Sequence, residues 1–278
     1  MSFDILIKKI IVRFKNIIFN LKLLMNAKKR FIYRMNNSDR FYLSDDEISK
    51  SIYVYDNFEN INRLFWGSLI KPGMNVIDIG ANWGVYSTAA RRLVGENGML
   101  MSFEPNKVEF EKLKENLKLN KFNQKNITLI NSAVGDEEGT AEFFIPPNYK
   151  GAYGSMGRPK INEDCKVVKV PVVTMDDVLK KHGVSKVDVI KIDVEGAEIK
   201  VLHGMKKTLD AQSPVILMEV SDKRTEVFGY KAKELCVFLA DMGYSLYLPV
   251  LESGKIGLKT YEPSDHIKYV DIVAKKDK

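Results

Sequence analysis

The sequence predicts an α/β fold whose central sheet is mostly parallel and buried on both faces. From Met74 onward, short uninterrupted apolar runs alternate with segments whose apolar residues recur at helical spacing. The runs lack the apolar–polar alternation of a half-exposed strand, which is typical of parallel strands covered by helices on both sides. The chain has 278 residues, 45% of them hydrophobic and 28% charged, which is ordinary globular composition for one or two domains.

The predicted elements follow one another in a regular order. Helices are expected at 58–69, 85–93, 107–120, 175–181, 197–209 and 231–242. Strands are expected at 74–79, 99–103, 127–130, 140–145, 166–173, 187–192, 214–220, 244–248 and 269–274, the last two as a closing hairpin edge. A stretch rich in Gly, Pro and Lys at 146–160 interrupts the alternation, so we expect an insertion or lid at about 140–170.

Positive charge is concentrated at the N-terminus. Residues 1–34 carry nine Lys and Arg against one acid, a net charge of +8, while the other 244 residues sum to −1. The apolar residues of this segment recur at helical spacing, but its longest charge-free run is six residues, too short to span a bilayer. Two interpretations stay open: a helix lying on an anionic membrane surface, or a helix packing on the domain or on a second subunit.

We therefore divide the chain into a basic amphipathic segment (1–34), a helical lead-in (35–70) and a main domain (71–278). Because the excess positive charge lies outside the main domain, no nucleic-acid partner is expected. Cys165 and Cys236 offer no disulfide framework, which favours a reducing, cytoplasmic location, peripheral to the membrane if the basic segment docks there. The sequence predicts no oligomeric state.

Two features after the first strands indicate a ligand site. The first strand ends in Asp78, followed by Gly80 and Gly84, where missing side chains let the backbone approach a ligand or form a tight turn. The second strand ends at Glu104, 24 residues after Gly80. An acid at about that distance binds a ribose diol in dinucleotide folds, so an adenosine-containing cofactor is expected. A surface glutamate is the alternative.

Further acids follow two later strands. Asp193, Glu195 and Glu198 lie at the carboxyl end of the fourth strand of the βα pattern, and Glu219 lies at the end of the fifth. If the fourth strand continues, alternation puts Asp193 and Glu195 on the same side. A helix start explains Glu198 through the helix dipole but does not explain Asp193.

Together these stretches resemble the FkbM family of S-adenosylmethionine-dependent methyltransferases. The matching stretches are VIDIGANWGVYS (76–87), FEPN (103–106), NSAVGD (131–136), VTMDDVL (173–179), IKIDVEGAEIKVLHG (190–204) and PVILMEV (214–220). The resemblance implies a class I methyltransferase (Rossmann-like) three-layer fold over 71–278, with a seven-stranded, mostly parallel sheet and one antiparallel strand. It also implies O-methylation of a hydroxyl, typically of a sugar in a glycan or of a natural product.

The resemblance implies roles for individual residues. Those that would hold the methionine end of the cofactor are Asp78, Gly80, Asn82 and Gly84. Glu104 would take the ribose hydroxyls, Ser132 and Ala133 would flank the adenine, and Asp193 would face the sulfonium and the acceptor. The loop at 151–157 resembles a family element near the active site, which makes Ser155 an acceptor-side candidate. Tyr149 and Tyr153 in the same stretch are candidates for stacking on a sugar face.

A hydroxyl is a poor nucleophile, so a positioned base is expected. Asp193, Glu195 and Glu219 are the catalytic candidates, and a lone helical His203 is more often structural. No metal is expected, since no third oxygen ligand is evident beside two carboxylates. The preferred acceptor is a glycan or lipid-linked sugar, to which a docking N-terminus would bring the enzyme.

Two other functions fit the sequence less well. An NAD-dependent oxidoreductase is disfavoured because the chain lacks G-x-G-x-x-G after the first strand and lacks Tyr-x-x-x-Lys throughout. A non-catalytic, membrane-docked binding protein with the same fold is disfavoured because Asp78, Gly80, Glu104 and Asp193 are all present.

Overall fold

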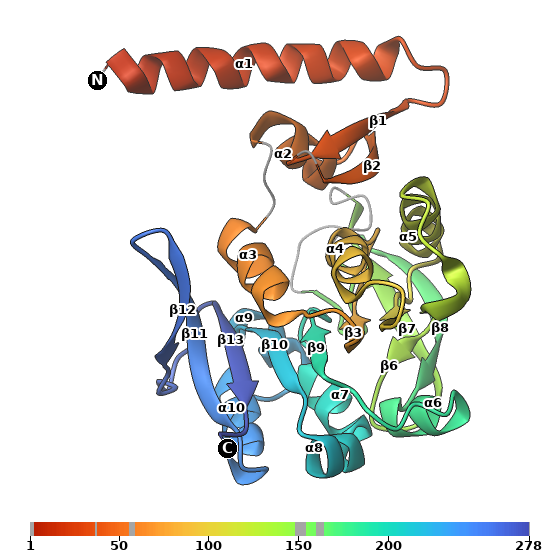
Figure 1. The fold of residues 1–278 in the computed structure, drawn as a ribbon, viewed down its shortest axis with the longest axis vertical. Coiled ribbons are helices and arrows are strands. Elements are labelled where there is room, and N and C mark those ends of the chain that lie inside the picture. Colours follow the sequence, from red (N-terminus) through yellow and green to blue (C-terminus); the bar gives the residue numbers. More distant parts are fainter. Residues whose placement is uncertain (1–2, 37, 56–58, 148–153, 160–163, 278) are drawn as a thin grey trace.

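An eight-stranded sheet forms the middle layer of the computed structural model, which describes residues 3–36, 38–55, 59–147, 154–159 and 164–277 (Figure 1). In spatial order the strands are β5 (Ile127–Ile130), β4 (Met99–Phe103), β3 (Asn75–Ile79), β9 (Val189–Ile192), β10 (Val215–Val220), β13 (Val270–Lys275), β11 (Ser245–Glu252) and β12 (Lys255–Thr260). The first five run parallel, and β13 lies antiparallel between β10 and β11.

Helices cover both faces of the sheet. On one face lie α3 (Asn60–Leu69), α4 (Val85–Val94) and α5 (Lys107–Leu119). On the other lie α6 (Met175–Lys181), α7 (Glu198–Gly204), α8 (Lys206–Gln212) and α10 (Ala232–Asp241). Side chains along each strand alternate between the two cores, so Val76 packs with the first set of helices and Ile77 with the second. The predicted three-layer α/β class is confirmed.

The sheet has one strand more than the seven expected. Strand β12 pairs with β11 beyond the predicted edge, and it was missed because its Lys-rich sequence reads as a loop. The two-residue connection Ser253–Gly254 has positive φ at both positions (50° and 76°), the conformation of a tight hairpin turn that matches strand twist. The predicted helix at 197–209 is also divided, because the chain leaves helical geometry at Met205 between α7 and α8.

A small separate sheet follows the parallel strands. It consists of β6 (Ala133–Val134), β8 (Lys166–Val173) and β7 (Gly139–Ile145), with β8 in the middle. The predicted strands at 140–145 and 166–173 are therefore confirmed as a paired unit rather than as part of the main sheet. The segment joining them returns at Ser155, whose backbone exchanges hydrogen bonds with that of Phe144.

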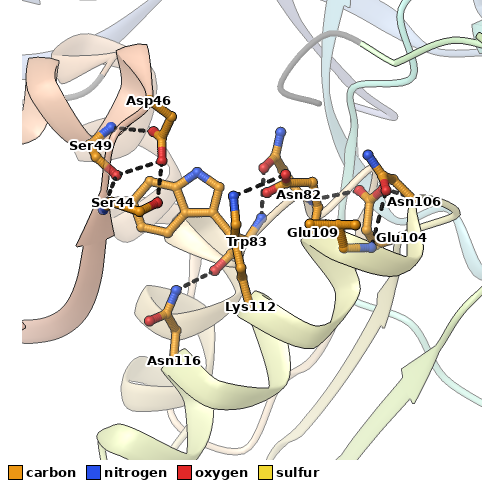
Figure 2. Close-up of polar contacts among 11 residues, drawn as sticks. Ser44, Asp46, Ser49, Asn82, Trp83, Glu104, Asn106, Glu109, Lys112 and Asn116 are labelled. Carbon is orange, nitrogen blue, oxygen red and sulfur yellow. Dashed lines mark hydrogen bonds and ion pairs between the residues drawn. The ribbon is translucent and has the colours of Figure 1, made fainter. Parts of the chain in front are cut away.

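The lead-in is not wholly helical. A hairpin of β1 (Arg30–Met35) and β2 (Asp39–Ser44) crosses the boundary expected at residue 34, and only then come α2 (Glu47–Tyr55) and α3. Figure 2 shows the start of α2, where the carboxylate of Asp46 accepts hydrogen bonds from the backbone and hydroxyl of Ser49. Strand β2 shows the alternation of a strand with one buried face: Phe41 and Leu43 are fully buried, and their neighbours are polar or half-exposed.

Among the described residues up to Tyr55, α1 (Phe3–Leu24), the β1–β2 hairpin and α2 form what we call the N-terminal lobe. Its core residues are Phe19, Leu23, Met35, Phe41, Leu43 and Ile52. Trp83 and Val85, which follow β3, belong to the same core, so the lobe packs directly on the loop that leaves the first parallel strand. Among the described residues, no helix is long and apolar enough to cross a membrane.

Candidate active site

A cavity of about 300 Å³ opens at the carboxyl ends of the parallel strands. The residues predicted from the sequence that line it are Asp78, Gly80, Asn82, Gly84, Glu104, Ser132, Ala133, Asp193, Glu195 and Glu219. They come from the ends of β3, β4, β9 and β10 and from the segment after β5. Because parallel strands end at one edge of the sheet, positions more than 140 residues apart in sequence meet in one cavity.

Glu104 is held from both sides by backbone amides (Figure 2). The amide of Asn82 donates to Oε2 and that of Asn106 to Oε1, each at 2.8 Å. The side chain is buried, and burial, opposed by these two bonds, raises the pKa of Glu104 to about 8. Each oxygen keeps a second lone pair, so the carboxylate is oriented to accept two further hydrogen bonds from a ligand.

Asp78 is fully buried at the end of β3. Its Oδ2 accepts a hydrogen bond from the hydroxyl of Ser87 at 2.6 Å, and that hydroxyl lies 2.9 Å from the Ser102 hydroxyl. Its Oδ1 is buried without a hydrogen-bond partner among the described residues. Burial raises the pKa of Asp78, although Lys191 opposes the shift. A buried acceptor without a donor is costly, and a ligand donor in the cavity would satisfy it.

The two glycines after β3 are required by the protein itself. Gly80 has φ +80°, and a Cβ there would lie 1.8 Å from the carbonyl oxygen of Asp193. Gly84 has φ +93°, and a Cβ there would lie 2.5 Å from a methyl group of Leu113. Of the two interpretations offered by the sequence, the tight turn with close backbone approach therefore accounts for both glycines.

The loop between these glycines is fixed by the N-terminal lobe. Trp83 is buried edge-on against Phe41, with ring centroids 5.5 Å apart, and its carbonyl accepts a hydrogen bond from Asn116 at 2.8 Å. The Oδ1 of Asn82 accepts from the Trp83 amide at 2.8 Å, and Asn82 itself has φ +50°. Asn82 therefore offers its backbone amide to Glu104, as Figure 2 shows, while its side chain holds the turn.

At the end of β9, next to Asp78 on β3, the cavity is lined by a paired charge cluster. The ammonium of Lys191 lies 2.7 Å from Oδ2 of Asp193 and 4.3 Å from the centre of the Tyr86 ring. Burial alone would lower the pKa of Lys191, but Asp193, Glu59 and Asp78 raise it above its ordinary value. Burial opposes ionisation of Asp193, yet Lys191 lowers its pKa. Asp193 is therefore a carboxylate facing the cavity.

Glu195 and Glu219 share a single cation. Arg224, from the short helix α9 (Asp222–Thr225), makes ion pairs with both carboxylates, with its Nε 2.7 Å from Oε1 of Glu219. Burial, together with the charges of Asp193 and Asp271, raises the pKa of Glu219 to about 9, so at neutral pH Glu219 is mostly protonated and Arg224 balances chiefly the charge of Glu195. Glu219, at the end of β10, therefore binds a proton more strongly than Asp193, at the end of β9.

Strand β9 does not continue to Glu195 as one interpretation required. It ends at Ile192, and Glu195 and Gly196 then turn through left-handed conformations with φ +58° and +106°. The turn still brings Asp193 and Glu195 to the same cavity. A non-glycine residue held at positive φ stores strain, and such positions cluster at functional sites.

A family model described as the Methyltransferase FkbM domain matches residues 78–246, more than half of the chain. The chain belongs to the FkbM methyltransferase family. The 2-O-methyltransferase NoeI of Sinorhizobium fredii is 30% identical over 178 residues, which cover 59% of this chain and 70% of that protein. The hexuronic acid methyltransferase AglP of Haloferax volcanii is 26% identical over 140 residues, covering 50% of this chain and 53% of that protein.

A ribosomal RNA large subunit methyltransferase E from Buchnera aphidicola is also similar. It is 31% identical over 148 residues, covering 49% of this chain and 62% of that enzyme. The chain thus spans about 60% of the length of several curated relatives that it matches.

S-adenosylmethionine is the cofactor of this FkbM-family chain, and the cavity fits it. The cofactor carries a ribose diol, an adenine and a methionine end with a sulfonium cation and an α-ammonium group. Glu104 offers two oriented acceptor oxygens, and the unpartnered Oδ1 of Asp78 offers a third. Ser132 and Ala133 line the side of the cavity next to Glu104, where the adenine would lie.

Two acceptor-side predictions have different outcomes. Ser155 is buried, and its hydroxyl donates to the carbonyl of Glu195 at 2.8 Å and accepts from the Gly157 amide. Its neighbours Gly154 and Met156 line the cavity, whereas Ser155 itself holds the segment against the Glu195 turn. Tyr149 and Tyr153 lie outside the described residues.

Two other candidates from the sequence lie outside the cavity lining. Glu198 is buried at the start of α7, where its Oε1 accepts from the Gly196 amide at 3.1 Å, so the helix-start interpretation is confirmed. His203 packs against the Phe238 ring with centroids 5.1 Å apart, in a structural role. Among the described residues, no three acids, histidines or cysteines are grouped closely enough to hold a metal ion.

Several lining residues were not singled out from the sequence: Lys191, Arg224, Glu59, Tyr86 and Tyr269. Lys191 gave a signal, since a lysine inside a buried apolar strand needs a charged partner. Glu59 and Tyr86 meet through a 2.6 Å hydrogen bond from the tyrosine hydroxyl. That contact joins the start of α3 to the start of α4 and depends on tertiary packing.

Proposed function

We propose that this protein transfers a methyl group from S-adenosylmethionine to a hydroxyl of a sugar-containing acceptor. The observation that carries the proposal is that two groups of acids line one cavity. Glu104 and Asp78 come from the ends of β4 and β3, and Asp193, Glu195 and Glu219 follow from the ends of the next strands, β9 and β10. An adenosine-containing donor held by the first group leaves its reacting end beside the second.

S-adenosylmethionine supplies a methyl group already activated by a positive sulfonium, so the chain mainly has to position the two reactants. Asp78 and Glu104 would hold the donor's nucleoside and amino acid halves, with Asn82 contributing through its backbone. Asp193 is kept ionised by Lys191 and would place negative charge beside the cationic donor. The close approach of Gly80 to the Asp193 carbonyl, and the hydrogen bond from the Asp193 amide to the Ile79 carbonyl, fix the ends of β3 and β9 against each other.

Glu219 is the carboxylate best suited to accept the proton of the acceptor hydroxyl. The pKa of Glu219 is raised to about 9 by burial and by Asp193 and Asp271, so its ionised form, which increases as pH rises toward 9, is the stronger base. Asp193, whose pKa is lowered, is the weaker base. Arg224 makes ion pairs with both Glu195 and Glu219. Glu195 would therefore contribute by holding Arg224 in place beside Glu219.

A sugar acceptor is supported by three observations. Two relatives carry names that specify a 2-O-methyltransferase and a hexuronic acid methyltransferase. Tyr269 is half-exposed at the cavity, where an aromatic face suits a sugar ring. The chain beyond residue 34 has a net charge of −1, which does not favour an RNA acceptor despite the similarity to a ribosomal RNA methyltransferase.

The test is transfer of a labelled methyl group from S-adenosylmethionine to a panel of acceptors. The panel contains free hexoses, uronic acids, lipid-linked saccharides and a ribosomal RNA fragment. We expect base-stable label in a saccharide, lost in Glu219→Gln and retained in the surface variant Glu138→Gln. Label in RNA alone would overturn the sugar assignment. No binding of S-adenosylhomocysteine would instead support a non-catalytic protein, and binding of NAD in its place would support the oxidoreductase.

A further inference from the structure

Helix α1 has two apolar faces, and the chain packs against one of them. Phe19 and Leu23 are buried in the core of the N-terminal lobe, and the ammonium of Lys15 donates to the carbonyl of Val54 at 2.9 Å. These contacts fix the rotation of the helix on the lobe. In Figure 1, α1 runs along the outer edge of the lobe, with its other side turned away from the rest of the chain.

The opposite face is apolar and exposed. Ile10, Phe14, Ile17, Leu21 and Leu24 recur at spacings of four and three residues, which places them in one stripe along the helix. Their exposed fractions are 59, 62, 52, 50 and 78%. Because the other side of α1 is anchored, this stripe cannot turn inward. A continuous exposed apolar surface of this kind marks a contact site.

Positive charge borders the stripe. At 3.6 residues per turn, Arg13 falls along one border of the stripe and is exposed. Lys22 is exposed on the side nearer the lobe, where its ammonium lies 5.2 and 5.1 Å from the centres of the Phe31 and Tyr53 rings. Lys28 and Lys29 are exposed just beyond the end of the helix. Residues 1–34 contain one acid, Asp4, against nine bases. The surface therefore complements a partner that is apolar at its centre and anionic at its boundary.

We propose that the exposed stripe of α1 docks this protein on an anionic lipid bilayer, with the helix in the plane of the membrane. The stripe would enter the boundary between headgroups and acyl chains, and the bordering bases would meet the lipid phosphates. A second copy of the chain fits less well, because pairing two such helices would bring bases together without acids to match them.

Docking would also orient the cavity relative to the membrane. Only this link to the acceptor rests on the proposed function. The core that anchors α1 contains Trp83, from the loop after β3, and Val85, at the start of α4, and both line the cavity. The cavity is therefore held in a fixed orientation relative to the docked helix. Such an orientation suits an acceptor carried by a membrane lipid. Vesicle binding needs no turnover, so docking and the proposed function fail separately.

The test is flotation of the full chain with vesicles of pure phosphatidylcholine or with 30% phosphatidylglycerol. We expect binding to the anionic vesicles that weakens as salt is raised. Phe14→Glu/Leu21→Glu should weaken binding at least about tenfold, because both side chains are exposed and the packed face is untouched. Arg13→Gln/Lys28→Gln should lower the affinity for anionic vesicles about fivefold for each base removed.

The matched control is Val237→Glu/Leu251→Glu, which places the same charges at exposed apolar positions far from α1 in the sequence. It should bind as the unaltered chain does. Circular dichroism checks that each variant is folded. Failure of the unaltered chain to float, or equal loss in the control, would overturn the proposal. So would sedimentation showing a vesicle-independent dimer that Phe14→Glu/Leu21→Glu dissolves, since the stripe would then bind a second copy.

Discussion

Replacing Glu104 by glutamine should remove most of the affinity for the cofactor while leaving the fold intact. In the carboxylate, each oxygen already accepts one backbone amide at 2.8 Å and retains a lone pair for a ribose hydroxyl. Glutamine keeps one acceptor oxygen and turns an NH₂ group toward the amide of Asn82 or Asn106. One ribose hydrogen bond is lost outright, and the other loses its charge.

The magnitude follows from the bonds removed. A hydrogen bond to a charged group contributes about 1.5–3 kcal/mol, and weakening the second bond adds to the loss. We therefore expect a loss of about 2–4 kcal/mol, or about 30- to 1,000-fold in the dissociation constant of S-adenosylhomocysteine. The titration is run calorimetrically at pH 9, above the pKa of about 8 for Glu104, so that the unaltered side chain is ionised.

Glu138→Gln is the control, because Glu138 is an exposed glutamate outside the cavity lining. It should bind S-adenosylhomocysteine as the unaltered chain does, and thermal unfolding should show both variants folded. Binding by Glu104→Gln within threefold of the unaltered protein would refute the assignment of Glu104 to the ribose.

Three further predictions concern protonation and packing. At pH 7 Glu104 is mostly protonated in the free protein, so cofactor binding should release close to one proton and tighten as pH rises from 6 to 8; calorimetry in buffers of different ionisation enthalpy measures this, and no proton release would contradict it. Because Glu219 accepts a proton only when ionised, kcat should rise with pH up to about 9. Glu219→Gln should lower kcat about 100-fold or more without changing the affinity for the cofactor. A kcat that does not change with pH would exclude Glu219 as the base. Gly80→Ala places a Cβ 1.8 Å from the carbonyl oxygen of Asp193, at a residue whose φ is +80°. It should therefore lower the free energy of unfolding by more than about 4 kcal/mol. Denaturant unfolding measures this, and an unchanged midpoint would refute the prediction.

Strand ends were predictable because they follow from local pattern and sheet geometry. The runs ending at Asp78, Glu104 and Asp193 are short and apolar, and parallel strands bring their carboxyl ends together whatever the details of packing. The third layer of helices and the position of the cavity follow from the same rule. Strand β12 was missed, since edge strands rich in lysine carry a weak apolar signal.

The rest of the site depends on contacts that no local pattern encodes. Glu59 reaches the cavity because α3 packs beside α4, and Arg224 reaches it from a four-residue helix. The ion pair with Lys191 lowers the pKa of Asp193, whereas burial raises that of Glu219, and both effects depend on tertiary packing. The N-terminal segment offered two interpretations; packing through Phe19 on the lobe is confirmed, while membrane docking stays a prediction.

A crystal structure of the protein grown with S-adenosylhomocysteine tests the central claim most directly. We expect ribose hydroxyls within hydrogen-bonding distance of both Glu104 oxygens, with the sulfur directed toward Asp193 and the adenine beside Ser132. Density for the compound anywhere else, or an orientation that leaves the Glu104 carboxylate without a ligand contact, would contradict it.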